Sequence, residues 1–514
     1  MPRPSSHLKA DICLVLEGTY PYVRGGVSTW VHQILEMFPQ WKFSLFYLGA
    51  NHDPQTKPKY ELPQNVVALE EVYLFDDAPA ALFAGAPDRE RWRQVYEHLR
   101  RLGLRTPQGD LHDLDMLHHI LEQIGRDRAV SFDAFWSHHE TWDVLREVYE
   151  RHAPEESFLN FYWTLRFLIL PLWKLARALE KLPAARLYHT ACTGYAGLVA
   201  ALAATRHKAP LVLTEHGIYL RERIADICRS QWIPDQMQQL PGLSDPLGSL
   251  RRLWIGFFDV VGRMCYSRSD VILSLFEKNA RAQEYFGADP QRIRIIPNGI
   301  CTEDFLPLMQ RRLERRREEP GSRVVGFLGR VVSIKDVKTL LRAAAKVLET
   351  VPDALFLVAG PTDEEPEYFA ECKELAVQLR IERQVQFLGP QDRDDFLPKI
   401  DVMMLTSISE GLPFVLIESM AAGVPVVSTD VGACAEILIG HEDSQTPAGC
   451  IAQVGNAEEV AQHVVRLLTE PEVLQGMTEA GLRRVARDYH ARAIRDAYFA
   501  IYETHLQAAE GQAA

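Results

Sequence analysis

The sequence predicts two doubly wound α/β domains that face one another, and three observations lead to this fold class. The chain has 514 residues, which is too many for a single compact core. Its second half alternates short apolar runs with helical stretches, a pattern typical of a parallel sheet with crossover helices. Its first half contains apolar runs of the same kind, interrupted by one long helical region.

The first domain is expected to span residues 1–310. A turn at Gly25 and Gly26 is expected to open a helix near 27–38. Residues 76–182 are dense in charges and aromatic residues at helical spacing and show little strand pattern, so we predict a helical insertion there. The apolar runs that predict its strands are 10–18, 43–49, 185–192, 209–217, 271–275 and 292–299.

The second domain is expected to span residues 323–485. The preceding segment, 311–322, has many charges and little apolar periodicity, which predicts a linker. A final helical segment, 486–514, is long enough to cross back to the first domain. The predicted strands of the second domain are 323–329, 354–360, 385–389, 402–407 and 425–429.

The composition of the chain indicates which binding partners and which cellular compartment to expect. The formal net charge of −13 argues against nucleic acid or an anionic membrane as the main partner, because both favour a basic surface. Eight scattered cysteines without a C-x-x-C pair favour the reduced cytosol. The first ten residues lack the apolar region of a signal peptide. The apolar segment 158–173 is shorter than a bilayer span, so we expect a buried or interfacial helix in a soluble, cytoplasmic chain.

Two carboxylates, Glu410 and Glu418, are separated by seven residues in the run SISEGLPFVLIES. The pattern predicts a buried strand, a Gly-Pro loop and a short helix, with Glu410 after the strand and Glu418 about two turns later. Ligands of open α/β sheets bind at the carboxyl ends of the strands. Two acids at that edge suit the hydroxyl groups of a sugar or a ribose.

A basic pair precedes these acids in GRVVSIKD. Arg330 follows a predicted strand, Lys335 comes just before a helix, and Asp336 is expected to cap that helix. Backbone N–H groups and the helix dipole favour an anion at such a crossing, and the two cations suit a diphosphate. Two solvated surface cations are the alternative.

The first domain offers weaker signals. Gly25 and Gly26 allow a ligand to approach the backbone closely, but any strand-to-helix turn can use glycine. His216 ends an apolar strand and can either donate a hydrogen bond to a sugar hydroxyl or cap a neighbouring carbonyl. For His189, also at a strand end, we favour a structural role.

Other chemistries lack their patterns. No G-x-G-x-x-G follows the first strand, and there is neither a Walker motif nor a G-x-S-x-G elbow. The two imidazoles of His138 and His139 point to different helix faces, which does not suit zinc. The D-x-D runs at 113–115 and 392–394 suit helix starts better than a metal site. We therefore expect no metal and no cofactor.

The two glutamates, the basic pair, the Gly-Gly turn and the strand-end histidine, together with IPNG at 296–299, form a pattern. This pattern resembles the retaining glycosyltransferases of family 4, which have the GT-B fold of two Rossmann-like domains. The resemblance covers most of residues 10–60 and 185–500. The opening segment 17–30 and the insertion more closely resemble the glycosyltransferases of Pel exopolysaccharide biosynthesis.

The resemblance implies a role for each candidate residue. Arg330 and Lys335 would bind the diphosphate of the donor, and Glu418 the ribose. Glu410 would contact the transferred sugar or support the cationic transition state. Gly25 and Gly26 would leave room for the distal phosphate, and His216 would meet the sugar from the opposite domain. The backbone that would touch sugar and phosphate is that of Gly411, Leu412, Pro413 and Phe414, and base recognition would use residues 388–391.

The implied activity is a metal-independent, retaining transfer of a hexose or N-acetylhexosamine from a UDP-sugar to a growing exopolysaccharide in a biofilm matrix. Inner-membrane polysaccharide synthase proteins would be the partners and would hold the cytoplasmic chain at the membrane. Two alternatives stay open. One is a nucleotide-sugar 2-epimerase, and the other is a non-catalytic nucleotide-sugar-binding subunit of a synthase complex.

Overall fold

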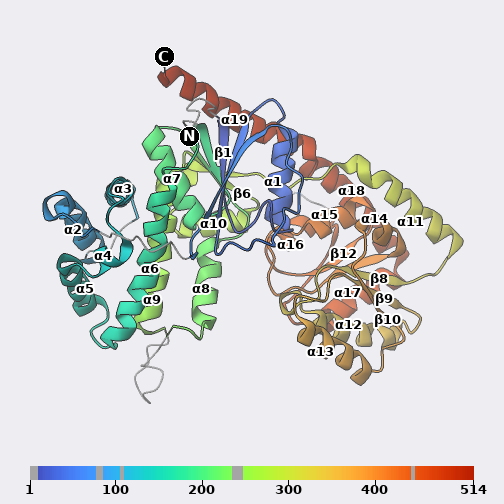
Figure 1. Cartoon of the computed structure of the whole chain (residues 1–514). Coiled ribbons are helices and arrows are strands. Elements are labelled where there is room, and N and C mark those ends of the chain that lie inside the picture. The colour runs from blue at the N-terminus through green and yellow to red at the C-terminus, as the bar shows by residue number, and fades with distance from the viewer. Residues whose placement is uncertain (1–9, 77–84, 105–108, 234–246, 441–445, 514) are drawn as a thin grey trace. The chain divides into compact units, whose positions relative to one another are not determined.

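The structure is a computed structural model, and it describes residues 10–76, 85–104, 109–233, 247–440 and 446–513. The chain forms two compact units (Figure 1). The N-terminal unit contains residues up to Ser274, Asn279–Ile295 and residues from Phe499 onward. The C-terminal unit contains Leu275–Lys278 and Ile296–Tyr498.

The N-terminal unit is built on a seven-stranded parallel sheet with strand order β3-β2-β1-β4-β5-β6-β7. Six of its strands lie at the predicted apolar runs, and β3 is an edge strand that the pattern did not indicate. The strands are β1 (Ala10–Glu17), β2 (Phe43–Gly49), β3 (Val66–Tyr73), β4 (Ala185–Thr190), β5 (Leu211–Glu215), β6 (Val271–Ser274) and β7 (Ile293–Ile295).

Helices cover this sheet because their apolar residues pack against it. Helix α7 is the clearest case: residues Tyr195–Ala204 are all buried. Within it, a side chain at Gly197 would come 2.4 Å from the Cys192 carbonyl oxygen, so glycine permits the close approach. The covering helices include α1 (Gly26–Met37), α7 (Tyr195–His207), α8 (Tyr219–Arg229), α9 (Gly248–Arg268) and α10 (Glu277–Tyr285).

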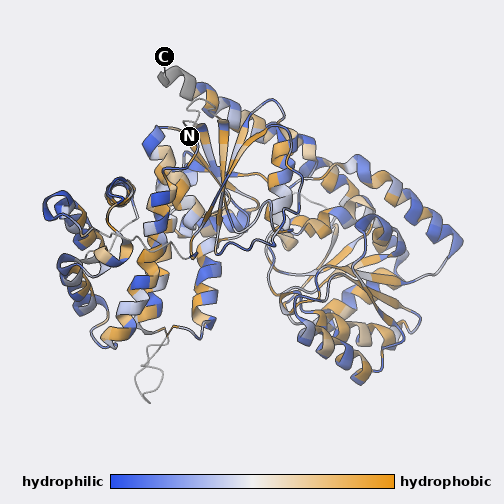
Figure 2. Cartoon of the chain, in the orientation of Figure 1, coloured by the Kyte–Doolittle hydropathy of each residue, from blue (hydrophilic) through white to orange (hydrophobic). Residues whose placement is uncertain are grey.

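The segment expected to be a helical insertion contains five helices among its described residues. An aromatic core holds them: the buried ring of Trp92 lies 5.6 Å from that of Phe135 and 6.0 Å from that of Trp173, between centroids. Figure 2 shows apolar residues on many of these helices. The helices are α2 (Arg89–Leu104), α3 (Leu111–Arg126), α4 (Phe132–Trp136), α5 (His139–His152) and α6 (Phe158–Ala178).

A search of the described residues for membrane-crossing segments found no helix with the length and apolar character that a bilayer span needs.

The C-terminal unit contains a six-stranded parallel sheet with strand order β10-β9-β8-β11-β12-β13. The chain moves outward from β8 in one direction and then returns to place β11 on its other side. The strand order therefore reverses between β8 and β11. The strands are β8 (Val324–Leu328), β9 (Leu355–Ala359), β10 (Val385–Gly389), β11 (Val402–Leu405), β12 (Val426–Thr429) and β13 (Gly449–Ala452).

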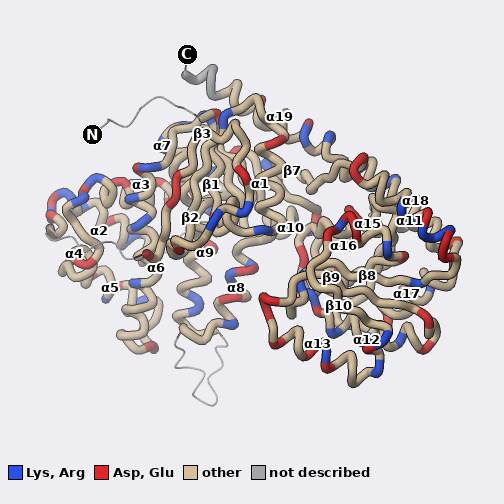
Figure 3. The backbone as a smooth tube through the Cα atoms, turned by 45° about the vertical axis from the view of Figure 1, so that its right-hand side comes forward, with Lys and Arg blue, Asp and Glu red and all other residues tan. Residues whose placement is uncertain are grey.

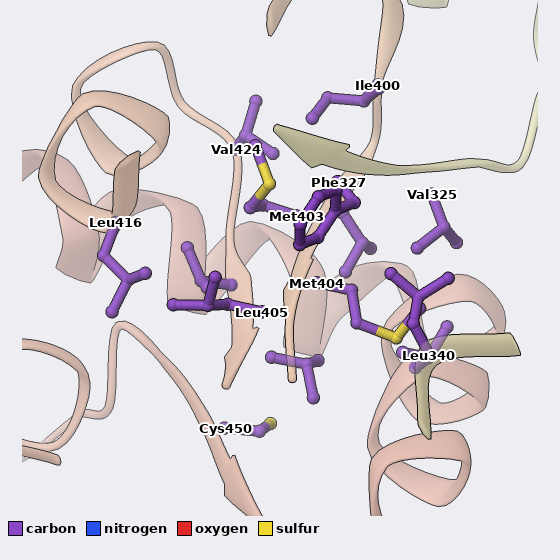
Figure 4. Packing of buried hydrophobic residues seen from close by; sticks show 14 of the residues in the cluster. Val325, Phe327, Leu340, Ile400, Met403, Met404, Leu405, Leu416, Val424 and Cys450 are labelled. Carbon is purple, nitrogen blue, oxygen red and sulfur yellow. The ribbon is translucent and has the colours of Figure 1, made fainter. Parts of the chain in front are cut away.

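The core of the C-terminal unit lies on both faces of this sheet. In Figure 4 the side chains of β11, Met403 to Leu405, are surrounded by Phe327 of β8 and by residues of the covering helices, including Leu340 and Leu416. The helices of this unit include α11 (Leu306–Glu318), α12 (Val337–Thr350), α13 (Pro366–Gln378), α14 (Arg393–Phe396), α15 (Phe414–Ala421), α16 (Cys434–Leu438), α17 (Ala457–Thr469) and α18 (Pro471–Asp488).

The predicted linker at 311–322 is wrong, because most of it lies in α11. The charged residues of α11 stand out in Figure 3, but two of them bond to other parts of the C-terminal unit. Buried Arg312 donates to the carbonyl oxygen of Ile400, and Arg315 lies 2.6 Å from Asp401. Residues 296–310 also group with the C-terminal unit and not with the first domain as expected, since Phe305 and Leu308 belong to its core.

Helix α19 (Ala491–Ala513) begins in the C-terminal unit, and from Phe499 onward it groups with the N-terminal unit. Its contacts there are specific. The ring of Phe499 stacks on Trp41 with centroids 5.3 Å apart, and the Tyr502 hydroxyl lies 2.7 Å from Nδ1 of His189.

Candidate functional site

The candidate site of the C-terminal unit lies at the carboxyl ends of β8 and β11, where the strand order reverses. Open α/β sheets bind their ligands at such a switch point. Two loops meet there, because the Ile408 amide donates to the Ile334 carbonyl at 2.8 Å. The Thr406 hydroxyl donates to the carbonyls of Lys335 and Asp336, at 3.2 and 2.9 Å. Three hydrogen bonds thus fix the loop of the basic pair to the loop of Glu410.

The structure brings Lys335 and Glu410 together. Nζ of Lys335 lies 2.6 Å from Oε1 of Glu410, and the Ser407 hydroxyl donates to the same oxygen at 2.6 Å. The two charged side chains are only 19% and 11% exposed. Low exposure strengthens a charge-assisted hydrogen bond, so this pair is held more firmly than a surface ion pair.

The local backbone explains the position of Lys335. A single 3₁₀ turn, Ser333–Lys335, leads into Asp336, whose φ of +45° is in the left-handed region that aspartate tolerates better than most residues. The Asp336 carboxylate accepts from the Thr339 amide, which confirms the predicted cap of α12. The chain therefore turns sharply, and Lys335 is placed immediately before the helix start.

Arg330 pairs with a carboxylate that the sequence pattern did not indicate. Its guanidinium donates to both oxygens of Glu364, at 2.5 and 2.7 Å, and its side chain is 52% exposed. The backbone around it is tightly packed. Gly360 has a φ of +148°, and a Cβ there would lie 1.8 Å from the Gly329 carbonyl oxygen.

Glu418 lies on α15 and has a different cation as its partner. Its Oε1 accepts from the Arg393 guanidinium at 2.9 Å, and that guanidinium lies 4.7 Å from the centre of the Phe305 ring. Burial raises the pKa of the Glu418 carboxyl above its ordinary value, and the nearby arginine opposes that shift. The two glutamates therefore have separate electrostatic environments.

The loop between the two glutamates packs closely against Gly432. That residue has a φ of +52°, and a Cβ there would lie 2.2 Å from the Gly411 carbonyl oxygen. The Ala433 amide donates to the same oxygen at 2.9 Å. Helix α15 begins at Phe414, directly after Pro413. The side chain of Leu412 is buried in the core, so only the backbone of Leu412 is available to a ligand.

Residues 388–391, which are predicted to recognise the base, form hydrogen bonds with one another. The Gln391 side-chain amide donates to the carbonyls of Leu388 and Pro390, at 3.2 and 3.1 Å.

In the N-terminal unit, the start of α1 is open. Gly25 precedes the helix with an extended φ of 166°, and no side chain caps it. A Cβ built on Gly25 or Gly26 would meet no atom within 4 Å. The space around both glycines is therefore open at the start of α1, and their role toward a phosphate stays a prediction.

The two strand-end histidines differ. His189 is fully bonded, with Nδ1 2.7 Å from the Tyr502 hydroxyl and Nε2 2.8 Å from the Thr214 hydroxyl, which confirms its structural role. His216 follows β5, and its ring lies 4.8 Å from that of Trp30. Its buried Nε2 has no hydrogen-bond partner among the described residues. Burial lowers the pKa of His216 to about 4, so the imidazole is neutral at pH 7.

An acidic network that was not predicted from the sequence lies at the carboxyl ends of β1 and β5. Glu17 accepts from the Tyr219 hydroxyl at 3.0 Å, and buried Glu215 accepts from the Tyr266 hydroxyl at 2.6 Å and from Gln283 at 3.1 Å. Burial raises the pKa of Glu215. Each glutamate is the last residue of an apolar strand, the same signal that identified His216.

Among the residues that the structure describes, no group of three or more His, Cys, Asp or Glu side chains could hold a metal ion. The metal-free site stays a prediction.

Comparison with known proteins adds two family matches. Residues 10–291 match the family "Domain of unknown function (DUF3492)", and residues 310–484 match "Glycosyl transferases group 1".

Two curated relatives match part of the chain. The D-inositol 3-phosphate glycosyltransferase of Corynebacterium urealyticum is 30% identical over 213 residues, covering 36% of this chain and 50% of that protein. The N-acetyl-alpha-D-glucosaminyl L-malate synthase of Bacillus anthracis is 29% identical over 265 residues, covering 50% of this chain and 63% of that protein. The matched part thus spans between half and two thirds of the length of these relatives.

The fold is that of a solved structure, Anabaena Alr3699/HepE in complex with UDP and glucose. The TM-score is 0.55 at 13% sequence identity, and the match covers 96% of this chain and 99% of the other. The predicted fold class is thereby confirmed. The chain belongs to the family described as "Domain of unknown function (DUF3492)"; its residues 310–484 match the group 1 glycosyltransferase model, and its two parallel-sheet units have the GT-B fold.

Proposed function

We propose that this chain is a hexosyltransferase that uses a UDP-sugar as donor and needs no metal ion. The observation that carries the proposal is the Lys335–Glu410 pair at the switch point of the C-terminal sheet, directly before α12. Two relatives, a D-inositol 3-phosphate glycosyltransferase and an N-acetyl-alpha-D-glucosaminyl L-malate synthase, support it. The UDP and glucose bound by Anabaena Alr3699/HepE agree with a UDP-sugar donor.

The diphosphate is the group that Lys335 would receive. A phosphate oxygen can replace the Glu410 carboxylate at Nζ, and the start of α12 adds the positive end of a helix dipole. Arg330, which is half exposed and pairs with Glu364 on the surface, can turn toward the same anion. As the bond between the anomeric carbon and the diphosphate breaks, these cations stabilise the charge on the leaving oxygen.

Glu410 would then act on the transferred sugar. Once Lys335 is bound to phosphate, the Glu410 carboxylate keeps its bond from Ser407 and can accept from a sugar hydroxyl or stabilise a cationic anomeric carbon. In a front-side attack, the departing phosphate oxygen takes the proton of the acceptor hydroxyl while that hydroxyl bonds to the anomeric carbon. The configuration of the sugar would be retained without a carboxylate nucleophile.

Glu418 is proposed to accept hydrogen bonds from the ribose hydroxyls. Arg393 donates to Oε1, and Oε2 of the same carboxylate would accept from the ribose. In the N-terminal unit, Gly25 and Gly26 are proposed to leave room for the distal phosphate, and the neutral His216 to donate a hydrogen bond to the sugar. The unpartnered Nε2 of His216 supports that last role.

The proposed acceptor is a growing exopolysaccharide of the Pel type, on the resemblance of residues 17–30 and of the insertion. The proposed location is the cytoplasm, next to inner-membrane polysaccharide synthase proteins. The proposed sugar is a hexose or an N-acetylhexosamine.

A turnover panel tests these proposals. UDP-glucose, UDP-N-acetylglucosamine, UDP-galactose and UDP-N-acetylgalactosamine are each incubated with the protein, EDTA and oligosaccharide acceptors, and the anomeric configuration of any product is read by NMR. Transfer that needs a divalent ion contradicts the metal-free mechanism. A changed sugar nucleotide without acceptor indicates the 2-epimerase. Tight binding without turnover, even with membrane extract, indicates the non-catalytic subunit.

Variants test the anion site. Lys335→Ala and Arg330→Ala should each weaken UDP binding, with the larger effect at the less exposed Lys335. Lys338→Ala is the matched control, because Lys338 is also near the start of α12 but pairs with Glu371 away from the site. Equal UDP affinity in all three variants contradicts the assignment.

A further inference from the structure

A cavity of about 540 Å³ lies inside the N-terminal unit, between the helices of the insertion and α9. Side chains of α3, α4, α6 and α9 line it, among them Leu121, Phe135, Trp136, Leu168 and Val260. The volume is within the range of small-molecule sites, roughly 300–1,000 Å³. The proposed sugar-transfer chemistry uses none of these residues.

The polar groups in the lining already have partners within the protein. Nε2 of His152 lies 2.7 Å from the Gly103 carbonyl oxygen, and the Thr141 hydroxyl donates to the Phe135 carbonyl at 2.6 Å. The Asp259 carboxylate pairs with Arg263 at 3.0 Å. Among the described residues of the lining, the buried indole N–H of Trp136 is an exception. One donor cannot hold a sugar or a nucleotide, which needs several convergent polar groups, so the lining suits an apolar ligand.

The solvent side of the cavity is on α9. Arg252 and Gly256, one turn apart, both line the cavity, and both are exposed. The Arg252 guanidinium donates to Ser249 at 2.8 Å and lies 3.9 Å from the Glu155 carboxylate. A Cβ on Gly256 would meet no atom within 4 Å. The apolar interior thus opens beside a cation at a point where the backbone leaves free space.

Helix α6 is apolar on two opposite faces. One face lines the cavity with Leu165, Leu168 and Leu172. The other exposes Leu159, Trp163 and Phe167, at 62%, 45% and 48%. Its charged residues are all basic. A helix of this composition suits the boundary between water and lipid chains better than the surface of a polar domain.

We propose that this cavity binds the hydrocarbon chain of an amphiphile, a fatty-acyl or isoprenoid chain, with the polar head left at the solvent side near Arg252. Burial of the chain drives binding, and each methylene placed in the cavity should tighten it about fourfold. The chain can come from a free amphiphile or from a membrane lipid. This site is independent of the proposed sugar transfer.

The test is a chain-length series. Saturated fatty acids of eight to sixteen carbons, each below its micelle concentration, are titrated into the full-length protein by calorimetry. We expect saturable binding at one site, with affinity rising about fourfold per methylene and then levelling off when the cavity is full. Absence of saturable binding across the series, or an affinity that does not depend on chain length, overturns the proposal.

One variant links the binding to this cavity. Gly256→Phe places a ring in the free space and should reduce fatty-acid affinity at least tenfold, while leaving the unfolding temperature and UDP binding unchanged. Gly476→Phe is the matched control, since Gly476 lies in helix α18 of the other unit and also has no atom within 4 Å of a built Cβ. Equal fatty-acid affinity in the two variants contradicts the assignment.

Flotation with vesicles of phosphatidylcholine and phosphatidylglycerol in equal parts separates the two sources of the chain. Flotation that Gly256→Phe reduces assigns a membrane lipid, and fatty-acid binding without flotation assigns a free amphiphile. Flotation that Gly256→Phe leaves unchanged, together with no fatty-acid binding, rejects the cavity as the lipid site.

Discussion

Replacing Glu410 with glutamine should tighten the binding of UDP and abolish sugar transfer. In the structure the Lys335 ammonium donates a hydrogen bond to Glu410, and the same ammonium is proposed to bind the diphosphate. Glutamine has nearly the same shape and can still accept from Ser407, but it carries no charge. The variant therefore releases Lys335 for the phosphate and removes a repelling carboxylate, while the transferred sugar loses its charged partner.

The size of the effect follows from the geometry. A phosphate oxygen at hydrogen-bond distance from Nζ lies roughly 5 Å from Oε1, because Nζ and Oε1 are 2.6 Å apart. Two like charges at that distance repel by up to about 3 kcal/mol at an effective dielectric constant near 20. Salt and partial exposure reduce this to about 1–2 kcal/mol, or about a 5- to 30-fold tighter Kd. Lys335→Ala should do the opposite, with a loss of about 1.5–3 kcal/mol.

Calorimetric titration with UDP at fixed pH and ionic strength measures both variants. Raising the salt concentration should shrink the gain of Glu410→Gln, since the gain is electrostatic. The double variant shows whether the two effects are coupled, as residues in contact require. A Glu410→Gln protein that binds UDP no better than the unmodified protein refutes the reasoning, because the carboxylate would then not compete with the phosphate for Lys335.

Three further predictions concern stability. Arg393→Met should destabilise the C-terminal unit by about 2 kcal/mol in chemical denaturation, because it leaves the poorly exposed Glu418 carboxylate without its cation. Gly432→Ala should cost at least about 2 kcal/mol, since its Cβ would overlap a carbonyl, and should weaken UDP binding in the same titration. Burial holds the pKa of His189 at about 3 and of His216 at about 4, below the ordinary 6.5. The unfolded chain therefore binds more protons as pH falls from 6.5 toward 4, and stability should drop by about 1.4 kcal/mol per pH unit for each histidine. His216→Gln should lower the pH dependence of stability by the share of one histidine, measured as thermal unfolding at pH 7.5 and 5.

Most strands could be predicted because a parallel sheet covered on both faces leaves a continuous apolar run in the sequence. The strand β3 broke this rule: it is an edge strand, most of its residues are partly exposed, and Glu70 and Glu71 interrupt its apolar pattern. The linker prediction failed for a related reason. Charge density marks solvated chain only when the charges are solvated, and Arg312 is buried against backbone carbonyls.

The positions of the site residues could be predicted from the sequence, but their partners could not. A residue that follows an apolar strand lies at the carboxyl edge of the sheet, wherever the rest of the chain goes. Ser407 lies three residues before Glu410 on the same loop. The other two partners, Glu364 and Arg393, come from the loop after β9 and from the start of α14, and only the folded sheet brings them within hydrogen-bond distance. In the sequence, no local pattern distinguishes these partner residues from ordinary surface residues.

Glu410 and Glu418 show what this difference means for function. The sequence presents them as two similar acids near one sheet edge, both suited to the hydroxyl groups of a sugar or a ribose. In the structure, the partner of Glu410 is a cation that an incoming diphosphate would need, whereas the partner of Glu418 is Arg393, at the start of α14. An anion at Lys335 therefore changes the environment of Glu410 directly and leaves the Arg393–Glu418 pair in place. Two acids that respond differently to the same ligand can have separate roles, and donor binding would release Glu410 for the sugar at the moment when the sugar arrives.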